Sequence, residues 1–165
     1  MIPIINGDIF ESDCDIIMHQ VNCKGVMGSG VAKQVKDKYP EVYKHYKSIC
    51  MAHKKSEDLL GKCQFVYAFN PKLNRFIQIV NIFGQDNFAY DGQIYTNYDA
   101  LKRALLAARE EITKSFDESE LKNIKIGVPY LMSCYRGGGD WGIVSNMLET
   151  IFGDLNISYY KLDLQ

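Results

Sequence analysis

Short apolar segments of strand length alternate with longer segments of helical periodicity from one end of the chain to the other. The segments that predict strands span residues 2–5, 15–21, 64–69, 75–83, 124–131 and 157–162. The segments that predict helices span residues 31–39, 40–50, 97–116 and 140–153. Strands that alternate with helices form a mostly parallel sheet covered on both faces, and the turn at residues 70–74 adds a hairpin. We therefore predict the α/β class: a three-layer α/β/α sandwich with a mixed, mostly parallel central sheet.

The length and the net charge of the chain limit the number of domains and the classes of partner. The chain has 165 residues with no internal repeat, low-complexity tract or linker, which predicts one domain over residues 1–165. Lys and Arg number 19 against 20 Asp and Glu, for a net charge of -1. This balance argues against an extended nucleic-acid surface or an anionic membrane as partner, because both favour an excess of basic residues. We expect a monomer that has room for a small pocket for one diphosphate.

Cysteine usage is typical of a reducing compartment. The chain has five cysteines, an odd number, with no C-x-x-C pair and no histidine at a metal-binding spacing. Cys23 and Cys134 are predicted to be small buried residues and not nucleophiles, because neither has an identifiable basic partner. The first ten residues do not resemble a signal peptide, and no apolar run approaches the ~20 residues of a membrane span. We expect a cytoplasmic protein that uses no metal and no cofactor.

Two glycine-dense segments follow predicted strands, where open α/β sheets bind their ligands. The first spans residues 21–32, with glycines at 25, 28 and 30, and leads into a helix. Glycine lets the backbone approach a ligand closely, and N–H groups at a helix start favour an anion. The spacing G-x-x-G-x-G is neither a dinucleotide fingerprint nor a P-loop. An ordinary strand-to-helix turn is an equal alternative on spacing alone.

The second glycine-dense segment spans residues 133–141 and contains three consecutive glycines, 137–139. Three glycines cost backbone entropy, so a simple turn explains them poorly. Arg136 beside them is suited to pair with a phosphate. Asp140 stands where the final helix needs an N-cap, and catalysis is its alternative role. Trp141 is predicted to belong to the core and not to a ligand platform.

Three motifs together resemble the macrodomain family. Residues 6–9 are similar to its G-D-[IL] start, residues 19–32 to its first ligand loop, and residues 129–141 to its second. The M-G-[AS]-G-[IV]-A core of the first loop falls on residues 27–32. The resemblance covers nearly the whole chain and includes residues 83–98, which have a counterpart in the branch with the terminal ADP-ribose protein glycohydrolase and many bacterial and phage relatives. It implies a macrodomain fold that binds ADP-ribose or an ADP-ribosylated substrate.

The resemblance also implies roles for individual residues. Asp8 would accept a hydrogen bond from the adenine amino group, with the Ile9 backbone N–H beside it; a plain turn residue is the alternative for Asp8. Asn22 would lie near the distal ribose. The other implied ligand-binding residues are His19, Gly28, Ser29, Gly30, Val31, Ser133, Cys134, Tyr135, Arg136, Gly137 and Gly138.

The chain differs from the glycohydrolase branch at the positions of that branch's catalytic residues. There, a lysine after the middle strand attacks the distal ribose and an aspartate in the second loop assists. Here the aspartate position falls on Gly137 and the lysine position falls close to Ile82. We therefore predict that the lysine-adduct mechanism is unavailable. Tyr135 replaces a glycine of the second loop, which would narrow the distal pocket and either tighten ligand binding or block the substrate.

Asp140 and Asn22 remain as catalytic candidates. Asp140 would orient or deprotonate a water molecule while Asn22 positions the ribose. His19 is an alternative base, although its place in an apolar strand favours a buried core histidine. The resemblance leaves three functions open. They are a hydrolase of ADP-ribosyl linkages or ADP-ribose 1''-phosphate, a non-catalytic reader of ADP-ribose, and a binder of another NAD-derived or cyclic nucleotide.

Overall fold

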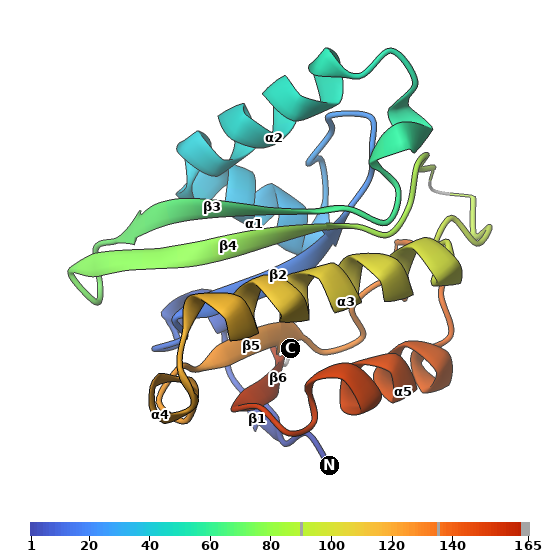
Figure 1. The fold of residues 1–165 in the computed structure, drawn as a ribbon. Coiled ribbons are helices and arrows are strands. Elements are labelled where there is room, and N and C mark those ends of the chain that lie inside the picture. The colour runs from blue at the N-terminus through green and yellow to red at the C-terminus, as the bar shows by residue number, and fades with distance from the viewer. Residues whose placement is uncertain (90, 135, 163–165) are drawn as a thin grey trace.

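A computed structural model describes residues 1–162 except 90 and 135. In these residues a six-stranded sheet has the order β1-β6-β5-β2-β4-β3 (Figure 1). Its strands are β1 (Ile4–Asn6), β2 (Ile16–Val21), β3 (Cys63–Asn70), β4 (Arg75–Phe83), β5 (Ile126–Pro129) and β6 (Ile157–Lys161). Strands β3 and β4 pair antiparallel as a hairpin, and every other pair is parallel. The predicted mixed, mostly parallel sheet is confirmed.

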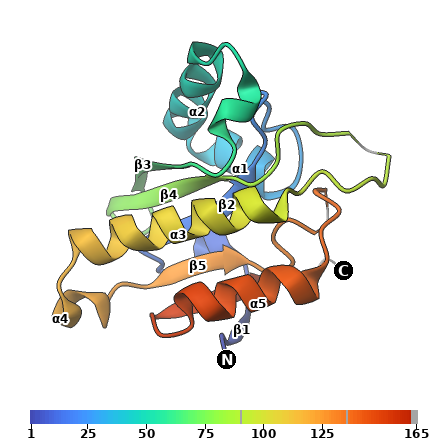
Figure 2. The ribbon, with the colours of Figure 1, turned by 45° about the vertical axis from the view of Figure 1, so that its right-hand side comes forward.

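Helices cover both faces of the sheet. Helices α1 (Gly30–Lys38) and α2 (Pro40–Ala52) lie on one face, and α3 (Tyr98–Ser115) and α5 (Trp141–Phe152) lie on the other (Figures 1 and 2). Each face has its own apolar core. None of the helices in the described residues is long and apolar enough to cross a membrane.

The central strand β2 explains why the sheet is covered twice. Its neighbours are β5 and β4, so it has no free edge. Ile16 and Met18 belong to the core under α3 and α5, whereas Ile17 and Val21 belong to the core under α1 and α2. A strand buried on both faces reads as a nearly continuous apolar run, which is why the sequence shows one here.

Two helices begin at side-chain N-caps, and the cap at Asp140 is the one that the sequence analysis predicts. The Asn97 side chain accepts a hydrogen bond from the Ala100 N–H at 3.0 Å, and Asp140 accepts one from the Ile143 N–H at 3.2 Å. Trp141, next to the second cap, is half-buried and makes edge contacts with Tyr130 and Tyr159, as predicted for a core residue. The sequence analysis did not predict three one-turn helices, because they are too short to show periodicity. They are Ile9–Glu11, Ser56–Leu59 and α4 (Glu118–Leu121).

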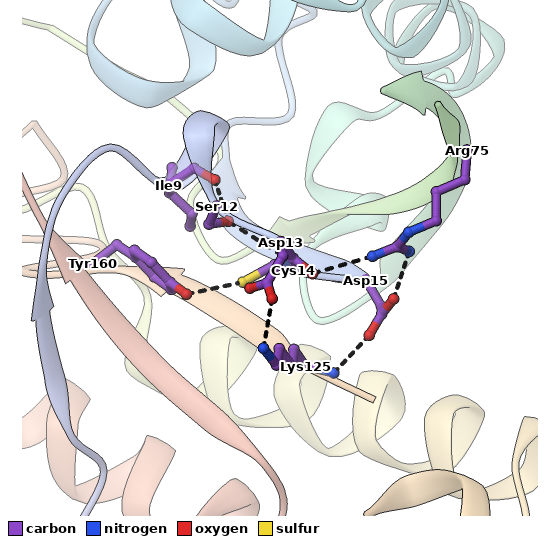
Figure 3. Close-up of polar contacts among 8 residues, drawn as sticks. All are labelled: Ile9, Ser12, Asp13, Cys14, Asp15, Arg75, Lys125 and Tyr160. Atoms are coloured by element: carbon purple, nitrogen blue, oxygen red, sulfur yellow. Dashed lines mark hydrogen bonds and ion pairs between the residues drawn. The ribbon is translucent and has the colours of Figure 1, made fainter. Parts of the chain in front are cut away.

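The amino ends of the central strands are joined by ion pairs (Figure 3). Asp15 Oδ1 contacts Arg75 Nη1 at 2.6 Å, and Asp15 Oδ2 accepts a hydrogen bond from the Lys125 N–H at 2.8 Å. Lys125 Nζ contacts Asp13 Oδ2 at 2.5 Å. The side chain of Lys125 lowers the pKa of Asp13. We call these four residues the amino-end cluster, and they connect the starts of β2, β4 and β5.

Candidate functional site

A cleft of about 210 Å³ opens at the carboxyl ends of β2, β4 and β5. Among the described residues its lining comes from 19–22, 26, 28–32, 85, 88–89, 129–133 and 136–137. Both glycine-dense segments therefore meet at one site, as expected for the loops at this edge of an α/β sheet. The predicted residues that line the cleft are His19, Asn22, Gly28, Ser29, Gly30, Val31, Ser133, Arg136 and Gly137.

Asn22 shapes the first loop from inside. Its Oδ1 accepts hydrogen bonds from the Lys24 N–H at 2.9 Å and from Tyr46 Oη at 2.8 Å, while its Nδ2 donates to the Val26 carbonyl at 2.8 Å. Burial raises the pKa of Tyr46 far above its usual range, so its hydroxyl remains a donor. The Asn22 amide is thus engaged by its own loop. Its predicted role beside the distal ribose stays a prediction.

The outer side of the first loop is tied to the segment after β4. Lys24 Nζ contacts Ser56 Oγ at 2.7 Å, and Ser56 Oγ donates to Asp86 Oδ1 at 2.6 Å. The Cys23 N–H donates to the Asp86 carbonyl at 3.0 Å. Cys23 is buried, and burial raises the pKa of its thiol to about 12. Its sulfur is therefore a protonated core atom, as predicted, and not a nucleophile.

The second loop adopts a backbone that ordinary residues rarely take. Leu131 and Ser133 have φ angles of 62° and 72°. The Ser133 carbonyl accepts hydrogen bonds from Thr96 Oγ1 at 2.8 Å and from the Gly139 N–H at 3.0 Å. A Cβ on Gly137 would lie 2.4 Å from Thr96 Oγ1 and 2.6 Å from the Ser133 carbonyl oxygen. Gly137 is therefore required by close packing, which explains at least one of the three consecutive glycines.

Gln20 connects the two loops and was missed by the sequence reasoning. Its Oε1 accepts a hydrogen bond from Ser133 Oγ at 2.6 Å, and its Nε2 donates to Gln85 Oε1 at 2.7 Å and to Thr96 Oγ1 at 3.1 Å. One amide thus holds three segments that are far apart in the chain. The available signal was a glutamine near the end of an otherwise apolar buried strand, where a polar side chain needs partners.

Five predicted site residues are not part of this lining. Asp8 caps the Ile9–Glu11 turn by accepting a hydrogen bond from the Phe10 N–H at 2.9 Å, and Ile9 is buried in the core. Asp140 serves as the cap of α5. Cys134 and Gly138 belong to the second loop but do not line the cleft. The turn and cap roles are observed, and the adenine-binding role of Asp8 and the catalytic role of Asp140 stay predictions.

The remaining predicted site residues belong to the second loop. Tyr135 lies outside the described residues. Burial, with a contribution from Asp140, raises the pKa of the Cys134 thiol to about 11, so this half-buried cysteine is also protonated. Among the described lining residues none is a lysine, an aspartate or a glutamate.

His19 is buried in the floor of the cleft. Its ring Nε2 lies 2.7 Å from Asn81 Oδ1, and its Nδ1 has no hydrogen-bond partner within the described part of the chain. Burial lowers the pKa of His19 to about 4, so the ring is neutral at physiological pH. His19 is thus both a core histidine, as its strand position favoured, and a residue of the cleft.

The protein is a three-layer α/β/α sandwich in which two glycine loops meet over the carboxyl edge of a mixed sheet. The sequence model of the Macro domain family matches residues 18–146, and the chain belongs to this family. A DNA ADP-ribosyl glycohydrolase of Mycobacterium tuberculosis is 40% identical over 62 residues, which are 38% of this chain and 17% of that protein. An ADP-ribose 1''-phosphate phosphatase of Saccharomyces cerevisiae is 25% identical over 98% of each chain.

Solved structures show the same fold. The macrodomain of Mycobacterium tuberculosis DarG is similar with a TM-score of 0.74 at 23% identity, covering 100% of this chain and 99% of that one. Thermosipho africanus DarTG in complex with ADP-ribose has a TM-score of 0.73 at 20% identity, covering 96% of this chain and 41% of that one. The predicted family and fold are confirmed.

Proposed function

We propose that this macrodomain binds ADP-ribose in the cleft and hydrolyses an ADP-ribosyl linkage. The observation that carries the proposal is the entrance of α1. Gly28, Ser29 and Gly30 line the cleft there, and the Ser29 side chain makes no cap hydrogen bond to the helix. The first N–H groups of an α-helix have no partner within the helix, so they suit an anionic group such as a diphosphate.

The named relatives support the same ligand. Proteins similar to this chain are a DNA ADP-ribosyl glycohydrolase, an ADP-ribose 1''-phosphate phosphatase and a DarTG protein solved with ADP-ribose. The match to the mycobacterial glycohydrolase spans only 17% of that protein, so its substrate and partners are not carried over. The names of these relatives have ADP-ribose or an ADP-ribosyl group in common, and we propose ADP-ribose as the ligand of this protein.

Hydrolysis without a lysine needs a linkage with a good leaving group. A carboxylate is one, because the free acid has a pKa near ~4 and departs without strong general-acid help. Asp140 lies three residues after Gly137, which lines the cleft. Its Oδ1 caps α5. We propose that its carboxylate orients or deprotonates the attacking water once a ligand occupies the cleft.

A non-catalytic reader is the second candidate. The absence of Lys, Asp and Glu from the described lining residues favours it, because no carboxylate or amine touches the cleft directly. Hydrolysis would depend on the Asp140 carboxylate, which is not a lining residue. The hydrolase and the reader both bind ADP-ribose, and they differ in whether ADP-ribose is released from a substrate.

Calorimetry tests the ligand. We expect ADP-ribose to bind with a Kd of about 1 µM, or about -8 kcal/mol, and AMP and NAD to bind more weakly. Equal weak binding of all three would contradict a specific ADP-ribose site and favour a different nucleotide.

A matched pair of variants tests the chemistry. Asp140→Asn keeps an N-cap of nearly equal quality but removes the carboxylate, whereas Asp140→Ala removes both. With a carboxylate-linked ADP-ribosyl substrate, we expect both variants to lose release of ADP-ribose while Asp140→Asn keeps its thermal stability. Release that survives in Asp140→Asn would exclude Asp140 as the base. No release by the unmodified protein would identify a reader.

We also propose a cytoplasmic monomer. The five free cysteines support the reducing compartment, and the oligomeric state is left to the measurement. Sedimentation of the purified protein tests the oligomeric state, and a dimer at micromolar concentration would overturn that part.

A further inference from the structure

Three polar side chains form a row across the sheet beneath α1 and α2. The pairing register places His19 of β2 beside Asn81 of β4, and Asn81 beside Gln64 of β3. His19 Nε2 lies 2.7 Å from Asn81 Oδ1, and Asn81 Nδ2 donates to Gln64 Oε1 at 3.0 Å. Gln64 Nε2 donates to the His45 carbonyl of α2 at 3.2 Å. We call these side chains the amide relay.

The far end of the amide relay fixes the direction of every bond in it. A backbone carbonyl can only accept, so Gln64 must turn its NH₂ group toward His45 and its oxygen toward Asn81. Asn81 must then turn its NH₂ group toward Gln64 and its oxygen toward His19. That oxygen needs a donor, so His19 carries its proton on Nε2. The tautomer of His19 follows from a carbonyl on α2.

The other ring nitrogen is consequently a hydrogen-bond acceptor. Nδ1 of His19 is buried and has no hydrogen-bond partner among the described residues, and a buried acceptor that stays unpaired is destabilising. Burial holds the pKa of the ring at about 4, so protonation does not convert Nδ1 into a donor near neutral pH. Nδ1 is covered by its neighbours in the ligand-free protein, but His19 belongs to the lining of the cleft, so a ligand that displaces the side chains over the ring can supply the missing donor.

We propose that His19 Nδ1 accepts a hydrogen bond from a ribose hydroxyl of the bound ligand, and that the amide relay fixes it as an acceptor. This inference rests on the proposed binding of ADP-ribose. It makes His19 a specificity residue: a sugar hydroxyl can donate to Nδ1, whereas an ionised phosphate oxygen cannot and is repelled by the lone pair. The diphosphate is thereby directed away from the cleft floor and toward the start of α1.

Nitrogen-15 NMR tests the tautomer in the ligand-free protein. The variants His45→Ala and His53→Ala assign the three imidazoles by elimination, and neither removes a side chain of the relay. We expect the His19 signals of an Nε2–H tautomer at pH 7. An Nδ1–H tautomer or a charged ring would overturn the inference whether or not ADP-ribose binds.

Addition of ADP-ribose tests the acceptor role. We expect the His19 Nδ1 resonance to move toward the values of a hydrogen-bonded acceptor. Binding that is seen by calorimetry but leaves this resonance unchanged would overturn the inference and leave the proposed function intact. If calorimetry instead detects no binding of ADP-ribose, the proposed function is wrong, and the inferred contact of His19 with this ligand is wrong with it.

A variant pair on β3 tests the relay without touching the cleft, because Gln64 is not a lining residue. Gln64→Glu presents only acceptors, so Asn81 keeps its orientation and His19 keeps its tautomer. Gln64→Lys presents only donors, which favours a reversed Asn81 amide and an Nδ1–H tautomer. We expect a reversed tautomer and affinity for ADP-ribose weakened about fivefold in Gln64→Lys alone, the size of one neutral hydrogen bond. Identical tautomers in both folded variants would overturn the relay.

Discussion

The two ends of the sheet differ in the kind of side chain that joins their segments: charged pairs at the amino end and neutral groups around the cleft at the carboxyl end. At the amino end, Asp13, Asp15, Arg75 and Lys125 pair their charges with one another. At the carboxyl end, neutral amides and hydroxyls join the segments that line the cleft, and the lining includes a ring nitrogen with no hydrogen-bond partner in the described residues. Satisfied charges hold strands together, whereas unsatisfied neutral groups leave hydrogen-bonding capacity for a ligand. The comparison separates a stabilising end from a binding end.

The absence of carboxylates from the described lining has an electrostatic reason. An ADP-ribose diphosphate carries negative charge, and a nearby aspartate or glutamate would repel it in a site partly shielded from water. Gln20, Gln85 and Thr96 supply the same bracing without charge. A near-neutral protein can thus hold an anion by backbone N–H groups and helix entrances.

The largest expected effect is at Gly137. In Gly137→Val the new Cβ would collide with Thr96 Oγ1 and the Ser133 carbonyl, so the second loop must move away from the cleft. We expect ADP-ribose affinity to fall about 1,000-fold, or about 4 kcal/mol, in calorimetry. Binding that persists within tenfold would show that the second loop is not part of the ligand site.

The next effect concerns pH and the buried His19. Its pKa is about 4 in the folded protein and near ~6.5 in the unfolded chain, so the unfolded chain binds the proton first on acidification. Stability is full above about pH 6.5 and falls by about 3 kcal/mol as pH falls to about 4. Chemical unfolding across this range measures the loss.

His19→Phe is the control for that loss. The variant lacks the titrating ring, so its stability should decline less steeply between the same pH limits, with only carboxylates contributing. Equal slopes in the two proteins would mean that another group titrates and that His19 is not the source.

At the opposite end, Asp15→Ala should reduce stability without touching the ligand. The substitution removes acceptors from Arg75 and from the Lys125 N–H, which we expect to cost about 2 kcal/mol in chemical unfolding. ADP-ribose affinity should remain within twofold. Asp37→Ala is the matched control, because its exposed ion pair with Lys33 joins residues of a single helix. Weakened ligand binding in Asp15→Ala would break the division between the two ends.

The smallest effect is at Asp13. Asp13→Asn removes an exposed ion pair with Lys125, and such pairs contribute little. We expect the thermal unfolding midpoint to fall by about 1 °C, and the difference to shrink further at high salt. A loss as large as that of Asp15→Ala would mean that the amino-end cluster acts as a cooperative network.

The sequence predicts local features of this protein better than long-range ones. The order of strands and helices, the cap at Asp140 and the two glycine loops each depend on neighbouring residues, and the structure contains them. The contacts of Gln20 depend on partners 65, 76 and 113 residues away, which no local pattern specifies. The same holds for the amide relay, because the His45 carbonyl of α2 determines which atoms donate and which accept along it.

The outermost strand has a consequence for how the chain folds. Among the described strands β1 pairs only with β6, and the Gly7 N–H donates to the Lys161 carbonyl at 2.9 Å. Strand β1 is the first of the described strands in the chain and β6 is the last, so β1 cannot pair until β6 has been synthesised. Asp8 lies two residues after β1, so the residue predicted to contact adenine is fixed in place only after β6 has been synthesised.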